Sequence, residues 1–129
     1  MVACAQAAFH AAIEVARAGV RVSEIGRAVE KEVHRHGFHV VPELAGHGVG
    51  RTIHEPPTVP NCWDPRLRAV LTEGLVLTIE PLISAGPAHP VQSADGWTLR
   101  TSDASLAAHY EHTIVIMHGR PVVLTEDAA

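Results

Sequence analysis

Residues 46–57 of the chain read Gly46-His47-Gly48-Val49-Gly50-Arg51-Thr52-Ile53-His54-Glu55-Pro56-Pro57. The glycines on either side of His47 let the backbone approach other groups closely, so a histidine held there can present a ring nitrogen to a metal ion. The same three residues also fit a loop histidine that only closes a turn and binds no metal. His54 has a spacing from His47 that matches neither a zinc finger nor a His-x-x-x-His helix, so it need not bind the same ion. It could donate a hydrogen bond to a developing oxyanion, or it could be a surface histidine without a functional role.

Two glutamates lie in settings where a charge needs a partner. Glu80 stands in Thr78-Ile79-Glu80-Pro81, at the end of an apolar strand predicted for residues 75–80, and shares a strand face with Thr78. Glu111 stands in Tyr110-Glu111-His112-Thr113, at the start of an equally apolar run. Charged side chains are rarely buried unless they are paired or coordinated, so an ion pair with an arginine or a metal ion would satisfy each glutamate.

A strand predicted for residues 109–117 determines which side chains can join these glutamates. Alternation along it puts His109, Glu111 and Thr113 on one face and turns His112 the other way, which favours a structural role for His112. The candidate metal ligands are therefore His47, Glu80 and Glu111, with His54 close to the first of them in the sequence.

Helices are predicted ahead of this region. Residues 1–18 are rich in alanine and favour a helix that stops at Gly19. Ser23 is predicted as the N-cap of a second helix, whose apolar stripe recurs at three- and four-residue spacing before Gly37 ends it. The stripe consists of Val22, Ile25, Val29 and Val33.

The remaining elements are short. Strands are predicted for residues 38–41, 75–80, 97–101 and 109–117, and a turn at Gly119-Arg120 forms a hairpin with a strand at 122–124. Residues 43–68 and 86–96 read as loops, and the tail after Thr125 reads as frayed. Two helices followed by mostly antiparallel strands indicate an α+β fold in one domain.

Composition argues against several functional classes. The formal net charge is −4 and the basic residues are scattered, which gives no footprint for nucleic acid. No run reaches the ~18 apolar residues of a membrane helix, and Glu14 and Arg17 argue against a signal peptide, so we expect a cytoplasmic protein with no membrane partner. Cys4 and Cys62 form no disulfide framework or Cys-x-x-Cys pattern. The sequence has neither a serine nucleophile elbow nor a Walker-type phosphate loop.

In this order, the motifs resemble the C-terminal part of a type I methionine aminopeptidase, a metallopeptidase of the pita-bread group. The series runs from Gly46-His47-Gly48-Val49-Gly50 and His54-Glu55 through Thr78-Ile79-Glu80-Pro81 and Gly96-Trp97 to Tyr110-Glu111-His112-Thr113. The resemblance covers residues 1 to about 125. The last motif argues for the methionine enzymes over the proline-specific peptidases and creatinases of the same group.

The resemblance implies a role for each motif residue. His47 and Glu80 would bind one metal ion, and Glu111 would bridge two ions. His54 would contact the substrate and stabilise the tetrahedral intermediate, Glu80 would also shuttle a proton, and Trp97 would line the pocket for the methionine side chain. The implied reaction is removal of N-terminal methionine from nascent peptides, by a metal-bound hydroxide with divalent Co, Mn, Fe or Zn ions.

The chain also departs from that family pattern. The resemblance implies two aspartate ligands from an upstream segment, and this sequence has no aspartate before Asp64. We therefore expect residues 1–129 to be a single partial peptidase domain, the second half of the pita-bread fold. Such a half would hold one metal ion or none by itself, where a complete site holds two. Ile53 stands where an aromatic residue is common, and His109 where glutamine is common, which affects the shape of the pocket.

Two other functions stay open on the sequence. A half-domain that binds a peptide or protein partner without catalysis would expose a sheet face and strand edges, which favours self-association through that face. A proline-specific pita-bread peptidase would cleave before proline and release no methionine.

Overall fold

The computed structural model describes residues 1–126, in which two helices precede ten short strands. The helices are α1 (Val2–Ile13) and α2 (Val22–Arg35). In chain order the strands are β1 (His39–Val40), β2 (Gly46–Gly48), β3 (Glu55–Val59), β4 (Val76–Ile79), β5 (Leu82–Ser84), β6 (Pro90–Gln92), β7 (Leu99–Thr101), β8 (Ala107–His109), β9 (His112–Val115) and β10 (Val122–Val123). Neither helix has the length and apolar character needed to cross a membrane, within the part of the chain described.

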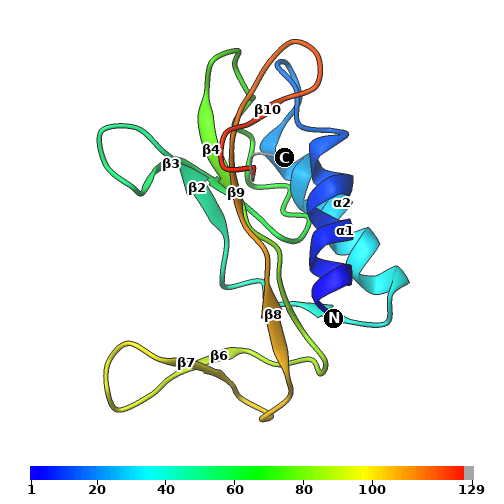
Figure 1. Cartoon of the computed structure of the whole chain (residues 1–129), viewed down its shortest axis with the longest axis vertical. Helices are drawn as coiled ribbons and strands as arrows, with labels where there is room; N and C mark the ends of the chain where they lie inside the picture. The colour runs from blue at the N-terminus through cyan, green and yellow to red at the C-terminus, as the bar shows by residue number, and fades with distance from the viewer. Residues whose placement is uncertain (127–129) are drawn as a thin grey trace.

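The strands form three antiparallel sheets. A five-stranded sheet has the order β10-β9-β4-β2-β3, a three-stranded sheet has the order β1-β5-β8, and β6 pairs only with β7. Figure 1 shows α1 and α2 together on one side of the strands, and the β6–β7 hairpin at the lower end, away from β2, β3 and β10. The α+β class and the antiparallel pairing predicted from the sequence are confirmed, as is the hairpin between β9 and β10.

The core lies between the two helices and the sheets. The predicted stripe of α2 is confirmed, because Val22, Ile25, Val29 and Val33 are all 0% exposed. Burial of each such side chain contributes roughly 1.5–3 kcal/mol to stability. Three of the six buried residues of α1 are alanines, whose small side chains let this helix pack closely against α2.

Two pairs of strands run in line with each other across a shared interruption. β4 pairs with β9 and β5 pairs with β8, and the register is the same on both sides of the break, with Ile79 opposite His112 and Leu82 opposite His109. Pro81 contributes no N–H to the ladder at the break. Continuing the register through the gap puts Glu80 directly opposite Glu111, so both carboxylates lie on one face at one level of the sheet.

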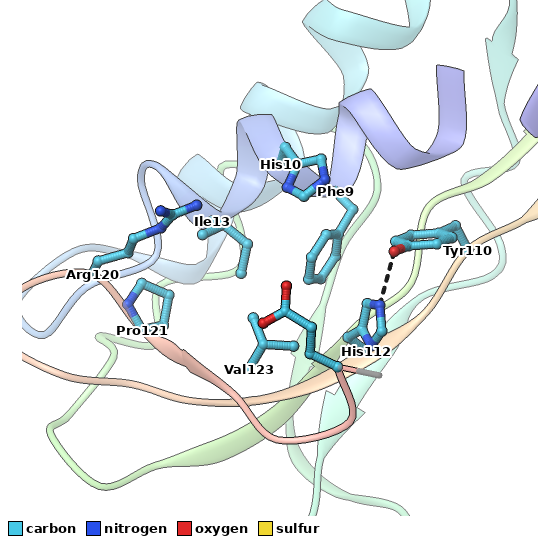
Figure 2. A pocket seen from close by; sticks show the side chains of 9 residues that line it. Phe9, His10, Ile13, Tyr110, His112, Arg120, Pro121 and Val123 are labelled. Carbon is cyan, nitrogen blue, oxygen red and sulfur yellow. Dashed lines mark hydrogen bonds between the residues drawn. The ribbon is translucent and has the colours of Figure 1, made fainter. Parts of the chain in front are cut away.

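At this level, the helices cover the opposite face of the sheet. His112 lies within an aromatic group with Phe9 and Tyr110, and Figure 2 shows these rings facing the hollow between α1 and β10. Both nitrogens of the His112 imidazole form hydrogen bonds, Nε2 with the Tyr110 hydroxyl and Nδ1 with the Thr125 hydroxyl, each at 2.9 Å. His112 therefore faces away from Glu111, as the alternation predicts.

The expected start of the second helix is wrong. The residue at the N-cap position is Arg21, and Ser23 lies buried inside the first turn of α2. The chain enters this helix from a β-bridge between Arg21 and Val70, and the Val22 N–H donates to the carbonyl of Ala69. This tertiary pairing replaces a side-chain cap, so the local capping signal does not decide the boundary.

Several strand and loop boundaries also differ from the expectations. Residues 43–68 contain β2 and β3, and residues 86–96 contain β6. The strand expected at 109–117 is divided between β8 and β9 at Tyr110-Glu111. The first helix, expected over residues 1–18, ends at Ile13, and the Ala18 N–H beyond it donates to the carbonyl of Met117. Within the tail expected to fray, residues 127–129 lie outside the described part.

Candidate metal centre

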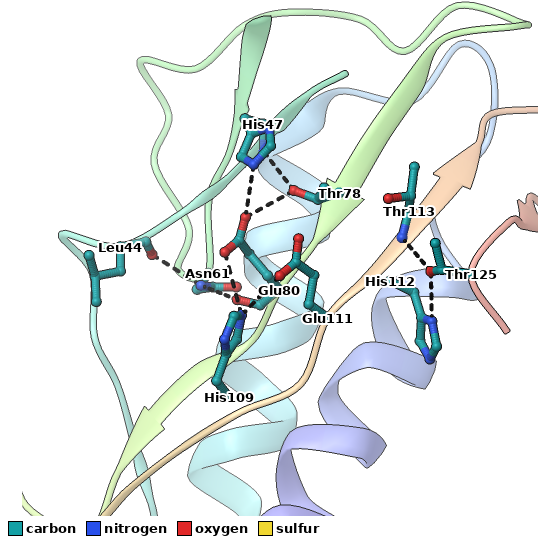
Figure 3. A network of polar contacts seen from close by, with 10 residues as sticks. All are labelled: Leu44, His47, Asn61, Thr78, Glu80, His109, Glu111, His112, Thr113 and Thr125. Atoms are coloured by element: carbon teal, nitrogen blue, oxygen red, sulfur yellow. Dashed lines mark hydrogen bonds and ion pairs between the residues drawn. The ribbon is translucent and has the colours of Figure 1, made fainter. Parts of the chain in front are cut away.

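Three side chains that the sequence singles out come together on the face of the sheet opposite α1. His47 comes from β2, Glu80 follows β4, and Glu111 precedes β9. A ligand atom from each lies within 4.8 Å of the ligand atoms of the other two. Figure 3 shows the three side chains converging from separate strands. A nitrogen and two carboxylates form a donor set that suits a divalent transition-metal ion.

Hydrogen bonds fix the orientation of His47. Its backbone N–H donates to Thr78 Oγ1 at 3.0 Å, and the Thr78 hydroxyl donates to Glu80 Oε1 at 2.9 Å. The ring Nδ1 lies 2.9 Å from the carbonyl oxygen of Gly48. Because a carbonyl only accepts, Nδ1 is the nitrogen that donates here, and Nε2 is the nitrogen that a metal ion could bind. Nε2 lies 3.6 Å from Glu80 Oε1, the arrangement of a metal ligand whose other nitrogen is anchored.

Glu80 lies between two imidazoles. Its other oxygen, Oε2, lies 3.5 Å from His109 Nε2, and only 13% of the Glu80 side chain is exposed. Burial raises the pKa of Glu80, but hydrogen bonds from His109 and Thr78 outweigh it and hold the pKa below the usual range. The hydrogen bond to Glu80 in turn raises the pKa of His109, against the opposing effect of burial. In the metal-free protein these two groups form an ion pair.

That pair makes the stability of the metal-free protein depend on pH. The pKa of Glu80 is lowered on folding from its usual value of 4.5. Its contribution to the free energy of unfolding is therefore present above pH 4.5 and is lost as the pH falls through the pKa of the folded state. The pKa of His109 is raised on folding from its usual value of 6.5. Its contribution to the free energy of unfolding is therefore complete below pH 6.5 and is lost as the pH rises through the pKa of the folded state. We expect the pair to stabilise the fold most between these two limits.

Urea unfolding of the wild type and a His109→Gln variant, in the presence of a chelator, would measure this effect. The difference in unfolding free energy should be greatest near about pH 5.5 and should shrink toward both about pH 3 and about pH 9. A difference that stays constant across this range would contradict the ion pair.

His54 and Trp97 occupy very different places. The ring centroid of His54 lies 4.2 Å from that of His47, at the exposed edge of the centre. Trp97 lies in the turn between β6 and β7, where the residue is 89% exposed and its backbone N–H donates to Asp95. The structure thus brings His54 to the candidate ligands and does not bring Trp97 there.

Asn61 supports the centre and was missed by sequence reasoning. Its side chain is buried, and Nδ2 donates both to the Leu44 carbonyl at 3.0 Å and to the Glu80 carbonyl at 2.9 Å. It therefore ties the loop before β2 to the break after β4. An asparagine between Pro60 and Cys62, in a segment that reads as a loop, gives no signal for this role.

The described aspartates bond to neighbours in their own loops. Asp64 accepts from Arg66, Asp95 from Thr98, and Asp103 from Ser105. Asp127 lies outside the described residues. The centre, as far as residues 1–126 form it, therefore contains histidine and glutamate but no aspartate.

Comparison with known proteins identifies the family. The model of metallopeptidase family M24 matches residues 1–118 of the chain. The chain belongs to metallopeptidase family M24. Membership in this family supports a divalent metal ion as a cofactor, and the group of His47, Glu80 and Glu111 could hold one.

Similar curated members of family M24 are bacterial methionine aminopeptidases. Methionine aminopeptidase 2 of Bacillus subtilis is 44% identical over 124 residues, which are 95% of this chain and 50% of the relative. The enzyme of Aquifex aeolicus is 43% identical over 125 residues, covering 92% of this chain and 47% of the relative. The chain thus spans about half the length of the curated relatives it matches. The resemblance to methionine aminopeptidases predicted from the motifs is confirmed.

Solved structures agree on the fold. The methionine aminopeptidase of Thermotoga maritima superposes with a TM-score of 0.91 at 37% identity, covering 97% of this chain and 50% of that one. The prolidase of Pyrococcus furiosus gives a TM-score of 0.70 at 25% identity, covering 99% of this chain and 32% of that one. The pita-bread fold expected for this chain is therefore confirmed.

Proposed function

We propose that this chain supplies one side of a divalent-metal site that hydrolyses the bond after an N-terminal methionine. The observation that carries the proposal is the convergence of His47, Glu80 and Glu111 on one face of the sheet. Identity of 44% to a methionine aminopeptidase, against 25% to a prolidase structure, favours N-terminal methionine peptides or nascent chains over proline peptides as substrates. We further propose that residues 1–129 form a single partial peptidase domain and that the protein works in the cytoplasm.

The proposed ligands of the metal are His47 Nε2 and carboxylate oxygens of Glu80 and Glu111. Co, Mn, Fe and Zn ions all accept such mixed nitrogen and oxygen ligands. A divalent ion bound here would polarise the scissile carbonyl and lower the pKa of a water molecule. The hydrogen bond from His47 Nδ1 to Gly48 prepares Nε2 for this task before any ion binds.

The remaining proposed roles concern the substrate. His54 lies beside the ligand His47 and is exposed, so it can reach a bound peptide and donate a hydrogen bond to the oxygen on which charge develops. Glu80 would accept a proton from the attacking water and return it to the leaving amine. The assignment of Trp97 to the methionine pocket rests on the sequence resemblance alone.

A methionine-release assay tests the proposal. The purified chain with Mn²⁺ or Co²⁺ is expected to release free methionine from a Met-Ala-Ser peptide, and a Glu80→Ala variant is expected to release none. A peptide with proline in the second position should be cleaved more slowly. Folded, metal-loaded protein that binds the peptide and releases no methionine would contradict the proposal and favour a non-catalytic binding half-domain.

A further inference from the structure

A short segment connects the candidate metal centre to helix α2. Residues 60–63, here called the strap, follow β3 and run from the buried Pro60 and Asn61 to the exposed Trp63. Asn61 is 2% exposed, and Figure 3 shows it between Leu44 and Glu80, on the side of the strap that meets the centre. The other end of the strap packs on α2, so one segment contacts both the helix and the centre.

The amide of Asn61 joins the two segments that carry His47 and Glu80. Nδ2 donates to the Glu80 carbonyl at 2.9 Å and to the Leu44 carbonyl at 3.0 Å, and Leu44 precedes His47 by three residues. Because both partners are carbonyl oxygens, which only accept, both N–H groups of the amide are committed to these contacts. One buried group therefore sets the spacing between the backbones that carry two of the proposed metal ligands.

Glu80 is thereby held at two points. The Thr78 hydroxyl donates to its carboxylate at 2.9 Å, and Asn61 donates to its carbonyl in the break between β4 and β5. Because a peptide unit is planar, the bond to the carbonyl also fixes the position of the Cα that bears the carboxylate side chain. A displacement of Asn61 would therefore move this carboxylate relative to His47, whose Nε2 lies 3.6 Å from Oε1.

Helix α2 holds the outer end of the strap. The Trp63 N–H donates to Glu30 Oε2 at 3.1 Å, and the Arg27 guanidinium lies 5.1 Å from the centroid of the Trp63 ring, a cation–π contact. Gly26 lies beneath the strap, and a Cβ atom there would collide with the carbonyl of Cys62. Glycine inside a helix is destabilising relative to alanine, and this close approach gives a physical reason for it.

We propose that Asn61 is a positioning residue of the metal centre and that the strap couples its position to the packing on α2. The Asn61 amide contacts the backbone of the ligand-bearing segments and neither proposed ligand side chain. Contacts made by Gly26 and Glu30 then influence the metal affinity of a centre that they do not touch. This inference rests on the proposed metal site and is independent of which peptide is hydrolysed.

Calorimetric titration of the metal-free chain with Co²⁺ tests the inference without any peptide. Asn61→Leu keeps a similar size and removes both donors, and its Kd for Co²⁺ is expected to rise at least about tenfold. The visible absorption of the bound Co²⁺ should change as well, because its ligands would be spaced differently. Val33→Ala is the matched control, because it opens a cavity at a fully buried position outside the strap, and it should keep the wild-type Kd.

Two variants of α2 test the outer end of the strap. Glu30→Ala removes the acceptor of the Trp63 N–H, and its Kd for Co²⁺ is expected to rise at least about twofold. Gly26→Ala pushes on the Cys62 carbonyl and should raise the Kd in the same way. Glu32→Ala is the control on the same helix, because Glu32 pairs with Arg35 and His36, and it should bind Co²⁺ as the wild type does.

Several outcomes would overturn the inference. One is a folded Asn61→Leu variant with the Kd and the absorption spectrum of the wild type; another is an equal rise of the Kd in Val33→Ala, which would trace the effect to lost stability alone. Should Asn61→Leu fail to fold, Glu30→Ala and Gly26→Ala decide the matter, and a wild-type Kd in both would refute the coupling. A wild type that binds no Co²⁺ would overturn the proposed metal site and this inference with it. Co²⁺ binding that depends on Asn61, without methionine release, would contradict the proposed reaction and leave this inference standing.

Discussion

A Glu80→Gln variant is expected to bind divalent metal at least about 100-fold more weakly than the wild type and to release no detectable methionine, while remaining folded. Glutamine has the shape of glutamate but lacks its charge. It can still accept the hydrogen bond that Thr78 donates at 2.9 Å, so the local structure survives. The oxygens that face His47 and His109 would no longer belong to a carboxylate, and the ligand set would lose its most buried charge.

Isothermal titration with Mn²⁺ or Co²⁺ measures the affinity, and urea unfolding in a chelator reports whether the fold is kept. Glu73→Gln provides the matched control, because Glu73 is exposed and pairs only with His118, at 2.9 Å, in the part of the chain described. That control should bind metal as the wild type does. Wild-type affinity in the Glu80→Gln variant would show that Glu80 is not a ligand.

The elements that alternation and periodicity predicted correctly are those whose side chains meet the core directly. The apolar stripe of α2 recurs at helical spacing and is buried as a unit, since the same residues that favour the helix also pack against the sheet. Thr78 and Glu80 were placed on one strand face, and their hydrogen bond agrees with this placement. Such features depend on neighbours a few residues apart, which a sequence displays.

Features that depend on register could not be predicted. The sequence offers Glu80-Pro81 and Tyr110-Glu111 as separate motifs, and only the pairing of β4 and β5 with β9 and β8 puts the two glutamates opposite each other. His109 was assigned to the right face, but its contact with Glu80 follows from the same register. Gly46 and Gly48 belong to a segment that was predicted to be a loop. They are instead needed inside the sheet, because neighbouring backbone leaves no room for a side chain.

A Gly46→Ala variant is expected to lose about 3 kcal/mol of stability. A Cβ atom at this position would lie 2.5 Å from the carbonyl oxygen of Thr78 and 3.1 Å from its Oγ1. Thr78 cannot withdraw, because β4 lies between β2 and β9 and the residue is 2% exposed. β2 must move instead, which weakens the hydrogen bond from His47 N–H to Thr78 and displaces the imidazole from Glu80.

Urea unfolding of this variant, with metal titration on the same sample, separates the loss of stability from the loss of the centre. Gly119→Ala is the matched control, because a Cβ there would meet no atom within 4 Å, and its stability should change by less than about 0.5 kcal/mol. Metal affinity in Gly46→Ala should fall even under conditions where the variant is fully folded, since the methyl group acts on the strand that carries His47. A Gly46→Ala protein with the stability and metal affinity of the wild type would mean that β2 does not pack against β4 closely enough for glycine to be required, and that His47 is oriented by other contacts.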